Sequence, residues 1–151
     1  MIRAPWTAVL AVLLAACGAS VQFSPFPGDD WVGPDGSPVS ADVVEAYSVA
    51  DECDAEGTAF LFVSWPLPGL ETDERPERRQ YVGDPSGLFA GAGLLAPYDG
   101  GATLSDGAGY TGFHSGDVQL WAGADVDRYL YLVKGATVEA WPRVDPEVAC
   151  R

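Results

Sequence analysis

An acidic stretch in the first half of the chain, DECDAEG at 51–57, contains the side chains best suited to bind a metal ion. Ca²⁺ takes about six to eight oxygen ligands, and three carboxylates of one turn could supply part of that set. The candidate ligands are Asp51, Asp54 and Glu56. Their spacing differs from the D-x-[DN]-x-[DN]-G pattern of an EF-hand loop, and a solvated turn between two strands explains the same residues equally well. Calcium binding therefore stays an open alternative.

His114 is the single histidine and stands in the sequence Phe113-His114-Ser115-Gly116-Asp117. A catalytic triad needs a base and a nucleophile that meet across space, with a third group that orients the base. Neighbouring residues of a strand or turn point to different sides, so this local run does not form a triad. We expect His114 to be a partly exposed turn residue, and we assign no catalytic residue.

Paired carboxylates and interleaved aromatic residues could also contact a ligand. Glycoside hydrolases use two carboxyl groups, but among 22 acidic residues the sequence singles out no pair. Aromatic side chains on strands could form a platform on which sugars stack, or they could fill the core. A deep pocket with two carboxylates of shifted pKa would favour a hydrolase, whereas a shallow face of exposed Trp and Tyr would favour binding. The aromatic candidates are Trp65, Trp121, Tyr129, Tyr131 and Trp141.

The elements that position these side chains are expected to be strands. Apolar, aromatic and β-branched runs predict strands at 58–65, 80–82, 118–121, 128–133 and 137–141. In the third of these, Gln119 and Trp121 would share one face. Gly135 lies in the turn of a hairpin formed by the last two strands, and Pro142 is expected to end it. The charged segment 68–79 and the Gly-rich segment 87–109 are expected to be mainly loops.

Residues 42–49 (DVVEAYSV) allow two interpretations. Asp42 and Glu45 have the spacing of a capping box, which would begin one short helix and give an α+β fold. The alternation of Val43, Glu45 and Tyr47 instead fits a strand, which we favour. The fold class that we predict is therefore mainly β, a small antiparallel sandwich or barrel.

The net charge of the chain is −14, with 22 acidic and 8 basic residues. Such a chain is repelled by the phosphate backbone, so we expect no nucleic-acid partner. Its length is sufficient for one domain with a hydrophobic core, and its high charge keeps such a domain soluble.

The N-terminus has the features of a secretion signal. Arg3 is followed by the apolar run 4–16, which is too short to cross ~30 Å of hydrocarbon as a helix. The run ends in Leu14-Ala15-Ala16-Cys17, which resembles the lipobox of bacterial lipoproteins. The resemblance implies cleavage before Cys17, whose thiol then receives a diacylglyceryl group, so that two or three acyl chains such as palmitate hold the protein on the membrane. An ordinary signal peptide and a buried apolar strand are the alternatives.

The lipobox divides the chain into a signal peptide (1–16), a lipidated N-terminus with a flexible tether (17–38) and a single β-rich domain (39–151). The tether is rich in Gly and Pro, yet Phe23, Phe26 and Trp31 interrupt it. These aromatic residues could dock on the domain or lie at the membrane interface.

Two cysteines, Cys53 and Cys150, remain besides the lipidated one. An exported protein enters an oxidising compartment, where an even pair indicates a disulfide. A bridge over nearly the whole domain would stabilise it by up to about 4–5 kcal/mol in the chain-entropy treatment. A zinc site is the weaker alternative, because neither cysteine lies in a CxxC pair.

The chain also resembles a group of small exported or lipid-anchored actinobacterial proteins of unknown function. The resemblance covers residues 40–150 and includes the segments TAFLFVSWPLP, RQYVGDP, SGDVQLW and YLYLVKGATVEAWPRVDPEVAC. It implies a paired-cysteine framework and assigns no activity. The pattern of that group has a histidine before the first cysteine and a tryptophan soon after it, whereas here Glu52 and Asp54 flank Cys53.

We therefore predict a β-rich domain that is closed by a disulfide and anchored on the outer face of the cell membrane. Its expected function is that of a non-enzymatic extracytoplasmic binding or envelope-associated module, whose ligand is a protein or a small molecule. We expect a monomer without a cofactor. The alternatives are a hydrolase that uses paired carboxylates and a calcium-binding surface domain.

Overall fold

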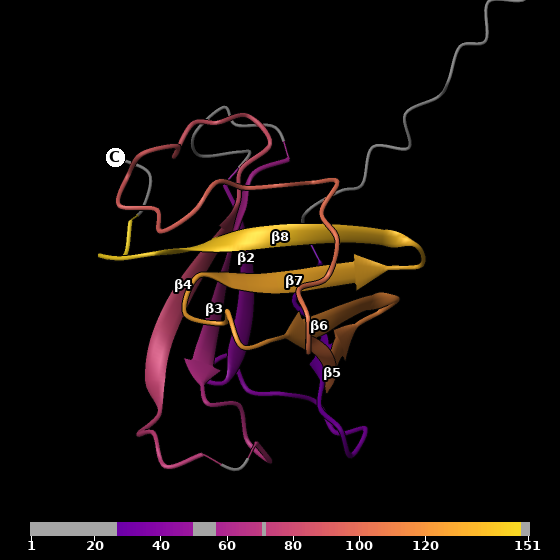
Figure 1. Ribbon diagram of the computed structural model, residues 1–151. Helices are drawn as coiled ribbons and strands as arrows, with labels where there is room; N and C mark the ends of the chain where they lie inside the picture. The colour runs from indigo at the N-terminus through magenta and orange to yellow at the C-terminus, as the bar shows by residue number, and fades with distance from the viewer. Residues whose placement is uncertain (1–26, 50–56, 71, 149–151) are drawn as a thin grey trace, which may run out of the picture.

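The computed structural model describes residues 27–49, 57–70 and 72–148, and these residues form strands and loops with no helix. Every strand pairing is antiparallel, and the strand order is β1-β5-β6-β7-β8-β4-β3-β2 (Figure 1). This confirms the predicted mainly β class. The strands are β1 (Trp31–Val32), β2 (Val44–Ser48), β3 (Ala59–Trp65), β4 (Glu77–Gly83), β5 (Gly109–Ser115), β6 (Val118–Ala122), β7 (Tyr129–Lys134) and β8 (Thr137–Val144).

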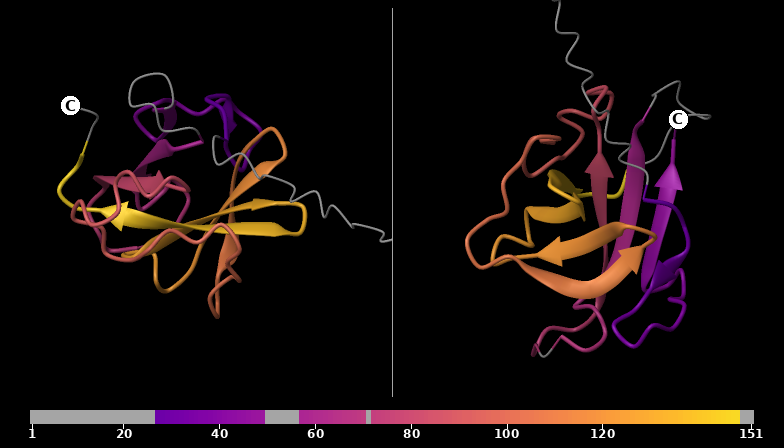
Figure 2. Two further views of the ribbon diagram at one scale, coloured as in Figure 1. Left: turned by 90° about the horizontal axis from the view of Figure 1, so that it is seen from above. Right: turned by 90° about the vertical axis from the view of Figure 1, so that its right-hand side faces the viewer.

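The strands form a nearly closed, barrel-like sheet. In Figure 2 the strands β6–β8 cross the strands β2–β4, and the two groups enclose the space between them. The strand β8 belongs to both groups, because its first part pairs with β7 and its last residues pair with β4. The short-helix alternative for residues 42–49 is wrong, since Val44–Ser48 pair with Ala59–Val63 of β3.

The prediction that Pro142 ends the last strand is also wrong, because β8 continues to Val144. Pro142 is opposite Tyr129 at the end of the β7 pairing, and the next residue, Arg143, is opposite Tyr81 of β4. Proline has no backbone N–H and is accepted in a strand where that donor is not needed. The place where β8 changes its partner is such a position.

The charged residues 77–79 lie in β4, although the sequence places them in an expected surface loop. They pair with Val63–Trp65 of β3. Arg79 is only 6% exposed, with Nε 2.6 Å from Glu77 Oε1 and Nη1 3.0 Å from Asp127 Oδ1. A charged side chain is accepted inside a domain when it is paired, so these ion pairs allow a charged run to form a strand.

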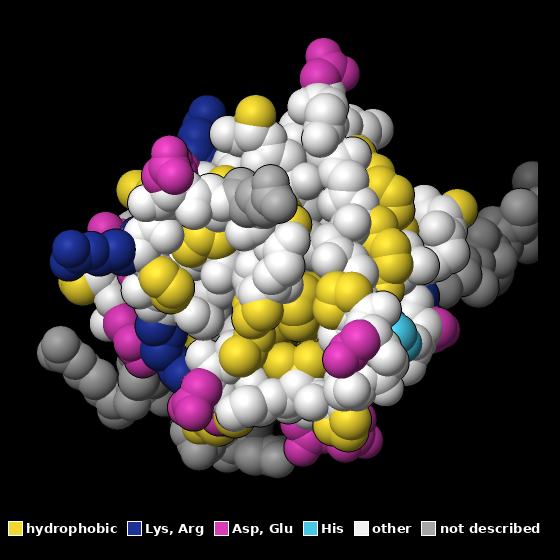
Figure 3. Space-filling view, turned by 90° about the horizontal axis from the view of Figure 1, so that it is seen from below, with side chains coloured by type: hydrophobic (Ala, Val, Ile, Leu, Met, Phe, Trp, Pro, Cys, Tyr) yellow, Lys and Arg dark blue, Asp and Glu magenta, His cyan; other side chains and the backbone are white. Residues whose placement is uncertain are grey.

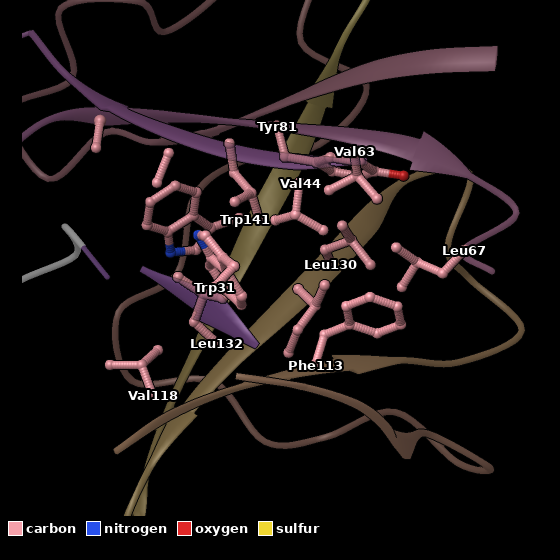
Figure 4. Packing of buried hydrophobic residues seen from close by; sticks show 14 of the residues in the cluster. Trp31, Val44, Val63, Leu67, Tyr81, Phe113, Val118, Leu130, Leu132 and Trp141 are labelled. Carbon is pink, nitrogen blue, oxygen red and sulfur yellow. The ribbon is translucent and has the colours of Figure 1, made fainter. Parts of the chain in front are cut away.

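The core lies between the two groups of strands and contains three tryptophans, of which Figure 4 labels Trp31 and Trp141. Inward-facing residues alternate along each strand, as in Leu130 and Leu132 of β7, both fully buried. Burial of each large apolar side chain stabilises the fold by about 1.5–3 kcal/mol. The largest members of the cluster are Trp31, Trp65, Tyr81, Phe113 and Trp141.

Trp31 lies within the segment 17–38 that we assigned to the tether. It is 1% exposed, and β1 pairs with β5 through Trp31↔Ser115 and Val32↔His114. Trp31 is therefore docked on the domain and does not lie at a membrane interface. The folded domain therefore includes residues before position 39.

Replacement of Gly83 tests the packing around Trp141. A Cβ at Gly83 would lie 2.5 Å from Cζ2 of Trp141, whose side chain is fully buried. We expect Gly83→Ala to lower the free energy of unfolding by about 1–3 kcal/mol, because the indole ring cannot move without displacing the core. Urea denaturation measures this change.

Gly109→Ala is the matched control. Gly109 also lies in a strand, but a Cβ there would meet no atom within 4 Å. We expect a change within about 0.5 kcal/mol for this variant. Equal losses in the two variants would contradict the close contact between β4 and Trp141.

Candidate ligand-binding face

The predicted lipid-attachment, disulfide and calcium residues lie outside the described part of the chain. They are Cys17, Cys53, Cys150, Asp51, Asp54 and Glu56. Their roles stay predictions. Within residues 27–49, 57–70 and 72–148, no group of three or more His, Cys, Asp or Glu side chains is placed to hold a metal ion.

The five aromatic candidates do not form one platform. Trp65 and Trp141 point into the core, where they are 8% and 0% exposed. The other three lie on the outer face of the sheet, because their neighbours in sequence, such as Leu120 and Leu132, point inward. These three are Trp121, Tyr129 and Tyr131.

The outer aromatic residues form a row across β5, β6 and β7. In the pairing register, Tyr110 is opposite Trp121, and Trp121 is opposite Tyr131. The ring centroids of Tyr110 and Trp121 are 6.1 Å apart, and those of Tyr129 and Tyr131 are also 6.1 Å apart. Both distances are within the range of favourable aromatic pairs. Tyr110 was not among the candidates, because no strand was expected at 109–115.

The loop between β4 and β5 covers one end of this row. Tyr131 is 4% exposed, and its hydroxyl is 2.5 Å from Oδ2 of Asp125, whose Oδ1 accepts a hydrogen bond from Ser105 of the loop. The Tyr129 hydroxyl donates to the carbonyl oxygen of Pro97 in the same loop. Tyr110, by contrast, is 44% exposed. The loop therefore contacts the β7 end of the row, and Tyr110 and the partly exposed Trp121 form the other end.

His114 and Gln119 lie beside this open pair. They are opposite each other in the pairing of β5 with β6. Gln119 Oε1 accepts a hydrogen bond of 2.9 Å from Trp121 Nε1, which confirms that these two residues share a face. The Tyr110 hydroxyl and His114 Nδ1 are 3.1 Å apart. The four side chains thus orient one another.

The expectation that His114 is a turn residue is wrong, because it lies in β5. The register between β5 and β6 shifts between Tyr110 and His114, as in a β-bulge. Gly112 lies in this bulge with φ +89°, and a Cβ there would be 2.6 Å from Cγ of Pro34. Residues four apart in a strand lie on the same face. Because residues 110–114 of β5 lie opposite only residues 119–121 of β6, the polar atoms of Tyr110 and His114 come into contact.

We name the open side chains Tyr110, His114, Gln119 and Trp121 the aromatic face. It offers two ring surfaces with the polar atoms of an imidazole, an amide and a phenol at their edges. Rings of this kind combine a large apolar contact area with few rotatable bonds, which makes them effective binding groups. The arrangement suits binding of a flat ligand that has hydroxyl groups at its edge.

Glu139 is a buried carboxyl group on the inner side of β8. It is 1% exposed, with Oε1 accepting from the Tyr98 hydroxyl (3.0 Å) and Oε2 from Trp141 Nε1 (2.9 Å). Burial raises the pKa of this carboxyl from 4.5 to about 7, although both hydrogen bonds act to lower it. Both carboxyl oxygens are thus hydrogen-bonded to neighbouring side chains, the buried Trp141 and the partly buried Tyr98.

Asp84 is the other buried acid among the described residues. Its Oδ1 accepts the backbone N–H of Leu88, and its Oδ2 accepts that of Phe89, both at 2.9 Å. The Ser86 hydroxyl also donates to Oδ1. These bonds hold the turn that follows β4. Neither buried acid therefore supports the alternative of a hydrolase with paired carboxylates.

Comparison with family models, curated proteins and solved structures gave no match for this chain. Among the described residues, no helix is long and apolar enough to cross a membrane.

The raised pKa of Glu139 predicts a pH dependence of stability. Between pH 4.5 and about 7 the folded state holds a proton that the unfolded state releases. The free energy of unfolding should therefore fall as the pH rises through this range, by up to about 3 kcal/mol. Urea denaturation at a series of pH values measures the slope.

Glu139→Gln should remove most of this slope, because the amide does not titrate. Glu147→Gln is the control, since Glu147 is exposed and should keep the wild-type slope. A slope that survives in Glu139→Gln would assign the pH dependence to another group.

Proposed function

We propose that this protein is a non-enzymatic binding module that works outside the cytoplasm and recognises a neutral saccharide through the aromatic face. The observation that supports the proposal is the pair of the exposed Tyr110 and the partly exposed Trp121, with ring centroids 6.1 Å apart and His114 and Gln119 beside it. Two aromatic rings with hydrogen-bonding groups at their edges match a sugar ring, which has apolar C–H faces and a rim of hydroxyl groups.

The negative net charge of the chain disfavours anionic ligands. A net charge of −14 repels anionic glycans and polyphosphates, so an uncharged sugar fits the molecule better. The aromatic face itself includes no acidic or basic side chain except the imidazole of His114. The shallow shape of an outer sheet face also suits binding of an extended oligosaccharide more than it suits hydrolysis, which needs enclosed carboxyl groups.

The N-terminus supports a location on the outer face of the cell membrane. The segment Leu14-Ala15-Ala16-Cys17 follows an apolar run, as in bacterial lipoproteins, and would hold the domain at the membrane through acyl chains on Cys17. In that compartment Cys53 and Cys150 would form a disulfide. An anchored domain at this position would meet the saccharides of the cell envelope.

Titration calorimetry with soluble neutral oligosaccharides, such as chitotriose and maltotriose, tests the binding proposal. Trp121→Ala should weaken binding about tenfold, or about 1.4 kcal/mol, because it removes one of the two stacking surfaces. Tyr110→Ala should have a similar effect. Tyr47→Ala is the matched control, because Tyr47 has a comparable exposure of 37% but lies on β2. Equal affinity of all three variants would contradict the proposed face.

Intact mass of the protein from membranes tests the anchor and the disulfide together. We expect a chain that begins at Cys17 with added acyl groups and lacks the two hydrogen atoms lost when Cys53 and Cys150 pair. Cys17→Ser should leave the signal peptide uncleaved and the acyl mass absent. An unacylated wild-type chain that has two free thiols would contradict both parts.

A further inference from the structure

A hollow at one end of the barrel is a second surface feature, separate from the aromatic face. Its volume is about 450 Å³. Figure 3 looks onto this end of the molecule, and hydrophobic side chains gather at the centre of the view. Phe113 reaches the hollow from the inner side of β5, whereas His114 points to the outer side. The apolar residues of the lining are Pro34, Pro38, Val39, Val43, Pro68 and Phe113.

Gly33 belongs to the lining, and a side chain at this position would contact other lining residues. A Cβ at Gly33 would lie 3.6 Å from Cγ2 of Val39 and 3.7 Å from Cε1 of Phe113, in ordinary contact with the floor. The turn that contains Gly33 is well defined, with hydrogen bonds from Gly36 N to Gly33 O and from Gly33 N to Ser37 O, both 2.9 Å. The space is thus a fixed part of the fold.

One carboxylate stands at the rim of this apolar floor. Asp35 also lines the hollow, and its two oxygens accept hydrogen bonds from the backbone N–H (3.0 Å) and the hydroxyl (3.1 Å) of Ser37. The backbone bond and the hydroxyl bond lower the pKa of Asp35 from its usual value, so the group is ionised at neutral pH. No basic side chain lines the hollow.

We propose that this hollow binds a small organic cation, with an ammonium or guanidinium group beside Asp35 and an apolar body on Val39, Val43 and Phe113. The charge of Asp35 is complementary to such a head group and repels an anion. The net charge of −14 also raises the local concentration of cations around the whole molecule. The open shape and the volume suit a ligand of a few carbon atoms more than a macromolecule.

Benzylammonium and benzyl alcohol are suitable probes, because they have nearly the same shape and differ in charge. The full chain is titrated with each at millimolar concentration, and amide chemical shifts are followed by heteronuclear NMR. We expect shifts at residues 33–43, 68–69 and 113, with benzylammonium bound about threefold more tightly, as for an exposed ion pair. Equal affinity for the two probes would overturn the proposal, and so would shifts confined to other residues.

Three variants distinguish the contribution of the Asp35 charge to binding from that of the shape of the hollow. Asp35→Asn should remove the preference for benzylammonium, while its amide oxygen can still accept a hydrogen bond from Ser37. Asp106→Asn is the charge-matched control at an exposed site outside the lining and should keep the preference. Gly33→Leu should fill the hollow and abolish binding of both probes. A preference for benzylammonium that persists in Asp35→Asn would overturn the proposal. The test does not depend on saccharide binding by the aromatic face.

Discussion

The sharing of β8 between two groups of strands is the constraint on which the rest of the structure depends. Trp141 lies on this strand, packs fully buried in the core and leaves no room for a side chain at position 83 of β4. Two residues later the strand begins to pair with β4 itself. Because β8 pairs with strands of both groups, it fixes the distance between the two groups and the angle at which they cross. The core between them is then closed by β1, whose Trp31 is paired with β5.

The inner and outer sides of β6 and β7 follow from this arrangement. Once Leu120 and Leu132 point into the core, the alternation of a strand places Trp121 and Tyr131 outside. The loop before β5 contacts the β7 end of this outer row of aromatic side chains. Its Asp99 pairs with Ala140 of β8, and its Pro97 carbonyl accepts a hydrogen bond from the Tyr129 hydroxyl. The aromatic face lies at the other end of this row, on β5 and β6.

Strong local patterns made part of the fold predictable. The apolar run at 58–65 and the hairpin around Gly135 correspond to β3 and to β7 with β8, because their side chains and turn chemistry favour these structures locally. The strand β5 was not predictable in the same way. Its sequence GYTGFHS contains two glycines, and a bulge interrupts its alternation. The two-residue strand β1 owes its position to a partner more than eighty residues away.

The candidate site could likewise be predicted only in part from the sequence. Trp121 could be recognised as an aromatic residue on a strand, but its pairing with Tyr110 depends on the register of two strands. Trp141 has a similar local sequence and nevertheless lies in the core. The decisive difference is the position of each strand in the sheet.

The buried Glu139 links the loop before β5 to the core. A carboxyl group in an apolar core costs stability unless it is protonated or hydrogen-bonded, and here Tyr98 and Trp141 supply two donors. These bonds connect the loop before β5 to β8 and to the central tryptophan. The same loop is held by backbone hydrogen bonds between Asp99 and Ala140 and between Leu95 and Arg143. The buried acid thus connects this loop to the strand that both groups of strands share.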